Sequence, residues 1–507
     1  MKKVLIIDFG GQTVQLIAKI LRKKHVYCEV FSWKSGYEKI QAFHPDALIL
    51  SGGNDSVYRH DSPFVDKRVY EMGVPVLGIC YGMHYTAHAL GGSVAKGKVA
   101  EFGKTEIQAK NCALFEGLPP KFDVWMSHFD AAGALPEGFE TIAYSKDCPV
   151  AAFQNEKRGV YGVQFHPEVH GCEHGEDIIG NFLKIAKIEG DFLLGGFIEK
   201  AIEDIHVKAA GGKVLCAFSG GVDSSVAAML AHRAVGDNLT CVFVDHGFMR
   251  KNEPKEIEKI FSGQMGINLI SVDAEKHFLD KLAGISDPEQ KRKIIGAEFI
   301  RVFEAEAKKL GKIDNLVQGT IYPDVIESGS GSGEVIKSHH NVGGLPSVMD
   351  FKGVIEPLRY LFKDEVRKVG LELGLPESVV NRQPFPGPGL AVRVLGELTK
   401  ERLDVLRDAD DIFREELDAA GLLNSVWQSF AVLTPVRSVG VMGDRRTYAN
   451  MIALRAINSV DGMTADWARI PYEVLDKVSR RITNECDGIN RVVYDITGKP
   501  PATIEWE

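Results

Sequence analysis

Hydrophobic residues occur along this chain in two alternating kinds of run. Short, continuous apolar runs are typical of strands buried on both faces, and the runs between them have the period of amphipathic helices. In the first part of the chain the strand-like runs are 4–7, 26–31, 47–50 and 74–79, and the helix-like runs are 13–23 and 63–72. This alternation predicts an α/β domain built on a doubly wound parallel sheet.

The alternation resumes after residue 213 and changes character beyond residue 383. The middle part has strand-like runs at 214–218, 240–245, 268–272 and 315–319, with a helix-like run at 226–231. The last part has strand-like runs at 430–435 and 438–441 and helix-like runs at 451–457 and 472–482. We expect a second doubly wound parallel sheet, followed by a small α+β unit whose strand-like, aromatic C-terminal tail is docked on it.

Two breaks in composition indicate where the domains end. Gly190 and Asp191 follow a helix-like run at 175–188. Residues 382–390 hold three prolines and two glycines, which cannot continue a helix or a central strand. Because 507 residues are too many for one core, we expect three domains: 1–190, 191–382 and 383–507.

Composition narrows the class of protein. The chain is 45% hydrophobic and 25% charged, as is usual for a globular protein. Its net charge of −9 argues against a broad nucleic-acid footprint. The eight cysteines include no Cys-x-x-Cys pair, and no apolar run reaches membrane-spanning length. The chain also begins directly with a strand-like run rather than a signal sequence, so we expect a cytoplasmic enzyme.

The heptad Ser219-Gly-Gly-Val-Asp-Ser-Ser225 lies between a predicted strand and a predicted helix. Such a loop directs backbone N–H groups and the positive end of a helix at one point, and its glycines allow an anion close approach. Asp223 beside a phosphate favours a divalent metal between the two. No Gly-Lys-Ser/Thr follows, so the loop is not a Walker A motif, although an ordinary capped turn is an alternative.

The heptad resembles the pyrophosphate loop of the N-type ATP pyrophosphatases. The resemblance implies that this loop holds the pyrophosphate of ATP, with Mg²⁺ at Asp223. The residues concerned are Ser219, Gly220, Gly221, Val222, Asp223, Ser224 and Ser225. Val244 ends a neighbouring strand, where its backbone could meet the adenine, and Arg250 follows where it could reach a phosphate.

A second candidate site is the turn Gly78-Ile-Cys80-Tyr-Gly82, which follows an apolar run and precedes a helix. This is the form of a nucleophile elbow, with cysteine as nucleophile. The helix N-terminus favours the thiolate. Downstream, a strand-like run leads to His166 as the base, with Glu168 two residues on, where strand alternation would place both side chains on one face.

These two motifs resemble the class I glutamine amidotransferases. The resemblance implies a Cys80–His166–Glu168 triad that hydrolyses glutamine through a thioester and releases ammonia. It also implies an oxyanion and glutamine site at Gly52, Gly53 and Tyr81. Two positions depart from the family: His84 replaces a common glutamine, and Phe129 replaces a small residue. Both departures affect glutamine recognition or signalling between the domains rather than the triad.

A Gly/Ser run at 327–334 suggests a lid over the ATP site, and the adjacent His339 and His340 are a weak candidate for metal binding. Four further segments, 319–328, 337–346, 382–390 and 499–507, resemble the family of glutamine-hydrolysing GMP synthetases. That resemblance implies ATP-dependent amination of xanthosine 5′-monophosphate (XMP) to GMP. It also implies a homodimer formed through the C-terminal domain.

The same resemblance implies that five residues contact XMP: Arg250, Pro386, Gly387, Lys499 and Glu505. The main alternative is another ligase of the same ATP-pyrophosphatase class, such as an NAD synthetase. An RNA thiolase should show a basic face, which the acidic balance disfavours. A regulatory module with inactive catalytic halves is a further alternative, disfavoured by the intact motifs at both sites.

Overall fold

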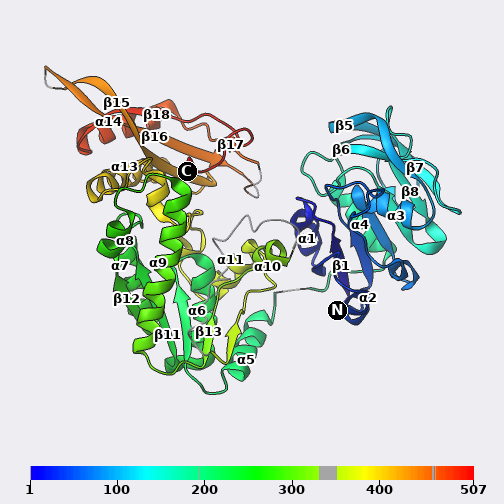
Figure 1. The fold of residues 1–507 in the computed structure, drawn as a ribbon, viewed down its shortest axis with the longest axis horizontal. Coiled ribbons are helices and arrows are strands. Elements are labelled where there is room, and N and C mark those ends of the chain that lie inside the picture. Colours follow the sequence, from blue (N-terminus) through cyan, green and yellow to red (C-terminus); the bar gives the residue numbers. More distant parts are fainter. Residues whose placement is uncertain (1, 193, 330–350, 443, 460–461, 463) are drawn as a thin grey trace. The chain divides into compact units, whose positions relative to one another are not determined.

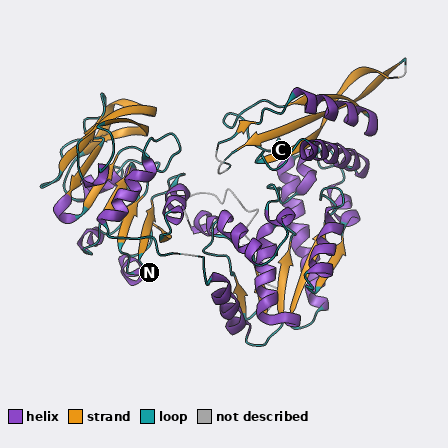
Figure 2. Ribbon diagram, turned by 180° about the vertical axis from the view of Figure 1, so that it is seen from behind, coloured by secondary structure: helices purple, strands orange, loops and turns teal. Residues whose placement is uncertain are grey.

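The structure is a computed structural model that describes residues 2–192, 194–329, 351–442, 444–459, 462 and 464–507 (Figure 1). The predicted lid at 327–334 is described only as far as residue 329, and the His339–His340 pair lies outside the described residues. The chain divides into two compact units, 1–195 with 323–336, and 196–322 with 337–507. The first unit contains one sheet and the second contains two, with helices packed beside them (Figure 2).

The first unit is built on one sheet of nine strands, in the order β2-β1-β3-β4-β9-β8-β7-β5-β6. The strands are β1 (Lys3–Asp8), β2 (Tyr27–Ser32), β3 (Ala47–Leu50), β4 (Val76–Ile79), β5 (Val94–Ala109), β6 (Lys121–Ala132), β7 (Glu140–Tyr144), β8 (Ala152–Asn155) and β9 (Val160–Val163). Its helices are α1 (Val14–Lys23), α2 (Tyr37–Phe43), α3 (Tyr81–Ala89) and α4 (Gly175–Ile185).

The four predicted strands of this unit are confirmed, and they pair in parallel with one another and with β9. From β9 onward the sheet is antiparallel. The predicted helix at 63–72 is wrong, because only a short 3-10 turn forms there, at Lys67–Glu71. Backbone carbonyls that a helix would use accept hydrogen bonds from side chains instead: Pro63 from Tyr81 and Val65 from Tyr85.

The second unit contains a five-stranded parallel sheet in the order β12-β11-β10-β13-β14. Its strands are β10 (Val214–Phe218), β11 (Leu239–Asp245), β12 (Leu269–Asp273), β13 (Asn315–Val317) and β14 (Gly353–Ile355). The helices before, between and after them are α5 (Phe197–Ala209), α6 (Val222–Val235), α7 (Glu253–Glu258), α8 (Glu275–Leu282), α9 (Pro288–Lys309), α11 (Lys363–Glu372) and α12 (Glu377–Val380). Helix α10 (Tyr322–Gly329) is grouped, from Pro323 onward, with the first unit. The predicted second parallel sheet is confirmed.

The C-terminal part adds a second, mainly antiparallel sheet to this unit. Its elements are α13 (Lys400–Ala419), β15 (Gln428–Met442), β16 (Arg445–Asn458), β17 (Asp466–Trp467), α14 (Tyr472–Glu485) and β18 (Ile489–Tyr494). The predicted helix at 451–457 is wrong, because this run is part of β16, which lies between β15 and β18. Its residues from Ile452 to Ile457 are all buried, so the run shows no period that distinguishes a strand from a helix.

One hydrophobic core joins the parallel sheet to the C-terminal elements. Leu215 and Val242 of the parallel sheet share this core with Leu403 of α13 and Leu454 of β16. The C-terminal tail is docked, as predicted, since the Glu507 carboxylate pairs with Lys291 at 2.7 Å. The boundaries at 190 and 382 stay predictions. None of the described helices combines the length and apolarity needed to cross a membrane.

Candidate active sites

Cys80 lies at a strained turn between β4 and α3, with φ +49° and ψ −105°. The glycines on either side make this turn sterically possible. A Cβ on Gly78 would lie 2.5 Å from the Gly82 carbonyl oxygen, and one on Gly82 would lie 2.2 Å from that of Leu50. The backbone thus has the geometry of a nucleophile elbow, with the sulfur at the N-terminus of a helix.

His166 and Glu168 lie next to Cys80 and form a short hydrogen bond, Nδ1 to Oε1, of 2.7 Å. Strand β9 ends at Val163, before either residue, so a turn brings the two side chains together. The sequence analysis expected them to lie on one face of a continuous strand instead. The same carboxylate oxygen accepts a hydrogen bond of 2.6 Å from the Thr13 hydroxyl. Because Nδ1 donates to the carboxylate, Nε2 is the ring nitrogen left to exchange a proton with the sulfur.

The environment of His166 favours the imidazolium. Burial lowers the pKa of His166, but the charge of Glu168 and the hydrogen bond to Cys80 outweigh burial and hold it well above 6.5. The Glu168 side chain is fully buried, and its second oxygen, Oε2, has no hydrogen-bond partner among the described residues. A buried, charged carboxylate of this kind stabilises positive charge on the neighbouring ring.

Replacing Glu168 with glutamine is expected to lower the kcat of the reaction at Cys80 about 100-fold, because the amide keeps the shape of the carboxylate without its charge. Glu176, which forms an exposed ion pair with Lys23, offers a matched control, Glu176→Gln. This control should leave kcat within about twofold, since exposed pairs contribute little.

The same substitution has a pH-dependent effect on stability. A folded-state pKa above 6.5 means that the His166–Glu168 pair contributes fully below pH 6.5 and loses its contribution as pH rises through the raised pKa. The difference in free energy of unfolding between the parent and Glu168→Gln should therefore shrink as pH rises above 6.5, as measured by denaturant titration. A difference that widens with pH would contradict this assignment.

Three backbone N–H groups near Cys80 are unpaired. Among the described hydrogen bonds, none uses the N–H of Gly52, Gly53 or Tyr81. A Cβ on Gly52 would lie 2.9 Å from His166 Cε1 and 3.8 Å from Cys80 Cβ, so this backbone closely approaches the triad. Free N–H groups at such a position are suited to an oxyanion.

Gln164, which the sequence analysis did not single out, also faces the nucleophile. Its Nε2 lies 3.9 Å from Cys80 Sγ, and its Oε1 lies 2.6 Å from His84 Nε2. Burial lowers the pKa of His84 to about 4, so its ring is neutral and donates to Gln164. Phe129, the other departure from the amidotransferase pattern, is exposed and packs edge-on against Phe102 at 5.0 Å.

The loop 219–225 joins β10 to α6 in the second unit, with Gly221 as the N-cap of the helix. Gly220 has φ +73°, and a Cβ there would lie 2.3 Å from Ile257 Cδ1, so glycine is required. Hydroxyl groups fix the loop, since Ser224 and Ser225 both donate to the Gly221 carbonyl, at 3.0 and 2.8 Å. The loop thus presents a helix N-terminus and polar groups, the features of an anion site.

The Asp223 side chain lies at the same helix end. Its Oδ2 pairs with Lys363 Nζ at 2.5 Å, and its Oδ1 is buried without a hydrogen-bond partner among the described residues. A carboxylate oxygen left unpaired beside an anion site fits a divalent cation such as Mg²⁺. On the neighbouring strand β11, the last residue paired with β10 is Phe243. Val244 follows it, at the carboxyl edge of the sheet.

Arg250 lies beside the proline-rich loop that begins at Arg382. Its guanidinium is 4.6 Å from the Phe385 ring, next to Pro386 and Gly387 in the sequence, and pairs with Asp410 at 3.0 Å. Burial lowers the pKa of Arg250 to about 10, so it stays charged at neutral pH. Its Nη2 is buried and has no hydrogen-bond partner among the described residues.

The other predicted XMP contacts have different surroundings. Glu505 accepts hydrogen bonds from both Arg393 Nη2 and Nε, at 2.8 and 3.0 Å, and Arg393 in turn lies 5.2 Å from the Phe385 ring. Lys499 makes its described contacts elsewhere, since its ammonium donates to the Gly462 carbonyl at 2.8 Å. The structure therefore gathers Arg250, the 385–387 loop and Glu505 around Phe385, with Lys499 held at Gly462.

Comparison with protein families matches three regions of the chain: residues 5–186 to glutamine amidotransferase class-I, 195–297 to NAD synthase, and 415–506 to the GMP synthase C terminal domain. Proteins named GMP synthase [glutamine-hydrolyzing] align over nearly the full length. Those of Acetivibrio thermocellus and Clostridium novyi are 59% and 58% identical, each over 99% of both chains. That of Clostridium tetani is 57% identical over 100% of both.

The chain belongs to the glutamine-hydrolysing GMP synthases. The predicted family and fold class are thereby confirmed. NAD synthase is a relative of one domain of this GMP synthase family member, whereas the GMP synthases match the whole chain.

Four polar residues of these sites were missed by the sequence analysis: Thr13, Gln164, Lys363 and Arg393. Each contacts a predicted site residue that is distant in the sequence, as Thr13 contacts Glu168 and Lys363 contacts Asp223. Gln164 lies only two residues before His166 and could have been found as part of the same motif. The other three carry no local signal.

Proposed function

We propose that this chain converts XMP to GMP, taking nitrogen from glutamine and cleaving ATP to AMP and pyrophosphate. The observation that supports this most strongly is the presence, in one chain related over its full length to GMP synthases, of both a cysteine elbow and a pyrophosphate-type loop. The first supplies ammonia, and the second activates the acceptor.

In the first unit, the Cys80 thiolate attacks the side-chain amide carbon of glutamine. The oxyanion that forms accepts hydrogen bonds from the free N–H groups at Gly52, Gly53 and Tyr81. His166, polarised by Glu168 and Thr13, protonates the departing ammonia and then activates the water that hydrolyses the thioester. Gln164 stabilises the sulfur, and His84 orients Gln164.

In the second unit, the 2-oxygen of XMP attacks the α-phosphorus of ATP, and pyrophosphate leaves. Ammonia then displaces AMP from the adenylyl-XMP to give GMP. Residues 219–225 hold the pyrophosphate at the helix N-terminus, with Val244 near the adenine. Mg²⁺, held by Asp223, would neutralise phosphate charge. Lys363 is within reach to contribute a second positive charge.

XMP binding is assigned to Arg250, Pro386, Gly387, Lys499 and Glu505. The buried, unpaired Nη2 of Arg250 supports a phosphate contact, because guanidinium groups bind phosphate strongly. Glu505 is paired with Arg393. To contact XMP, Glu505 must either bind both partners at once or release Arg393.

Three wider features are also proposed: a homodimer formed through the C-terminal residues 383–507, a cytoplasmic location, and coupling of the two reactions. Free ammonia is mostly protonated at neutral pH and would be lost to solvent. Hydrolysis of glutamine should therefore be faster with ATP and XMP bound. Equal glutaminase rates with and without both nucleotides would show that the two halves work independently.

A panel of acceptors tests the assignment of the substrate. The full chain is incubated with ATP, Mg²⁺ and glutamine, and AMP formation is measured with XMP, IMP or deamido-NAD. We expect the rate of AMP release with XMP to be at least about 100-fold higher than with either of the other acceptors. A site that forms hydrogen bonds to the polar groups of its substrate rejects analogues that lack them. Release with deamido-NAD would favour an NAD synthetase instead.

A further inference from the structure

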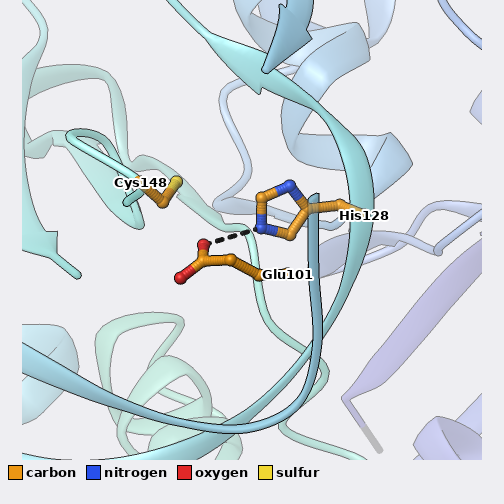
Figure 3. Close-up of side chains that lie close together, drawn as sticks. All are labelled: Glu101, His128 and Cys148. Carbon is orange, nitrogen blue, oxygen red and sulfur yellow. Dashed lines mark hydrogen bonds and ion pairs between the residues drawn. The ribbon is translucent and has the colours of Figure 1, made fainter. Parts of the chain in front are cut away.

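A cluster of Glu101, His128 and Cys148 lies in the first unit, apart from the residues assigned to the triad (Figure 3). Glu101 is on β5, His128 is on β6, and Cys148 is in the turn between β7 and β8. All three are buried, with exposed fractions of 7%, 6% and 1%. Their donor atoms, a carboxylate oxygen, an imidazole nitrogen and a thiol sulfur, all lie within 4.8 Å of one another.

The hydrogen bonds of His128 leave an unusual contact. Its Nδ1 lies 2.8 Å from the Asp130 carbonyl oxygen, which can only accept, so Nδ1 carries a proton. Nε2 faces Glu101 Oε2 at 3.1 Å. A neutral ring and an ionised carboxylate would face each other with lone pairs, so this contact needs a proton, on the ring or on the carboxyl group, or a metal ion between the two atoms.

The surroundings of the cluster are those of a metal site. A histidine that ligates a metal through one nitrogen commonly donates its other N–H to a backbone carbonyl, as His128 does to Asp130. The second oxygen of Glu101 accepts from the Ser145 hydroxyl at 2.7 Å. The Ser145 oxygen also accepts the N–H of Cys148 at 2.8 Å, so one hydroxyl orients both candidate ligands.

We propose that Glu101 Oε2, His128 Nε2 and Cys148 Sγ bind a buried zinc ion. Nitrogen, oxygen and thiolate sulfur together form a donor set that suits Zn²⁺, whereas Mg²⁺ and Ca²⁺ take oxygen ligands. Two ligands each about 2.1 Å from one ion lie roughly 3.0–3.4 Å apart, which matches the 3.1 Å between Nε2 and Oε2. The Cys148 thiol donates to the Val150 carbonyl at 3.4 Å, so zinc binding would release the thiol proton to solvent, break this hydrogen bond and draw the 145–148 turn toward the ion.

The consequence is structural support for the neighbouring catalytic site. Strand β6 also carries Ser127, whose carbonyl oxygen accepts a hydrogen bond from the Cys80 thiol at 3.7 Å. A zinc ion that ties β5 and β6 to the 145–148 turn would hold this carbonyl in place. It would not touch glutamine.

The test uses the untagged full-length chain, freed of metal with a chelator and then supplied with Zn²⁺ or Co²⁺ alone. We expect about one tightly held Zn²⁺ per chain, and a cobalt spectrum with the intense near-ultraviolet band of a thiolate ligand. In Cys148→Ser the thiolate band should be absent, and the affinity for zinc should be at least about tenfold lower. Cys112→Ser, a cysteine of the same unit outside the cluster, should keep both.

The circular dichroism spectrum shows whether each variant is folded, because both substitutions lie in the first unit, on which the ammonium-dependent reaction does not report. Zinc content no higher than that of the buffer, or a parent cobalt spectrum without a thiolate band, would overturn the proposal. The contact between His128 and Glu101 would then be a buried hydrogen bond in which the two groups share a proton. Zinc binding that Cys148→Ser leaves unchanged would equally overturn the proposal and would place the ion elsewhere in the chain.

Discussion

Replacing Cys80 with alanine is expected to abolish GMP formation from glutamine and to spare GMP formation from added ammonium ions. The sulfur is the nucleophile of the proposed thioester, and alanine offers no nucleophile in its place. Loss of a nucleophile of this kind lowers kcat by about 10⁴-fold or more. The ammonium reaction uses only the second unit, so its rate should stay within about twofold. Both rates are measured from AMP and GMP in one assay.

The matched control is Cys172→Ala, which removes another buried thiol of the same unit. The Cys172 sulfur donates to the Glu173 carbonyl at 3.6 Å and has no assigned part in the chemistry. Its glutamine-dependent rate should remain within about threefold of the parent, a change of under 1 kcal/mol. Loss of both activities in Cys80→Ala would contradict the division of labour between the two units.

Replacing Asp223 with asparagine is expected to abolish both the glutamine-dependent and the ammonium-dependent reactions. The substitution removes the proposed magnesium ligand and leaves the Lys363 ammonium without its partner. Metal-assisted charge stabilisation accounts for several kcal/mol of the barrier, so we expect a loss of about 10²–10⁴-fold in AMP formation. The Mg²⁺ concentration for half-maximal rate should rise as well.

Asp237→Asn is the control for this effect, because Asp237 is exposed just beyond the opposite end of α6. It should leave the rate and the Mg²⁺ dependence unchanged. Alkylation of Cys80 by iodoacetamide should proceed equally in Asp223→Asn and in the parent, which shows that the first unit is intact. Normal ammonium-dependent activity in Asp223→Asn would exclude Asp223 as a metal ligand.

The sequence could predict the elements that bear local signals. The runs 47–50 and 214–218 coincide with β3 and β10, because continuous apolar residues bounded by glycine and serine have few alternatives. The elbow and the 219–225 loop were also visible, since strained or anion-binding backbone requires glycine at fixed positions.

Features that depend on tertiary contacts were not predictable from the sequence. The run 451–457 is β16 only because β15 and β18 pair with it. Glu168 accepts a hydrogen bond from Thr13, which lies 155 residues earlier, and Asp223 pairs with Lys363, 140 residues later. Alternation along a strand suggested the right pair, His166 and Glu168, but the turn that joins them follows the end of β9.

The most direct test of the central claim follows the nitrogen. The full chain is supplied with XMP, ATP, Mg²⁺ and glutamine labelled with ¹⁵N at the side-chain amide. The products are then separated, and their masses are measured by mass spectrometry. The account predicts GMP that carries the label in its 2-amino group, with AMP, pyrophosphate and glutamate in equal amounts. Formation of ADP and phosphate, or label that remains in free ammonium ions with no GMP, would contradict it.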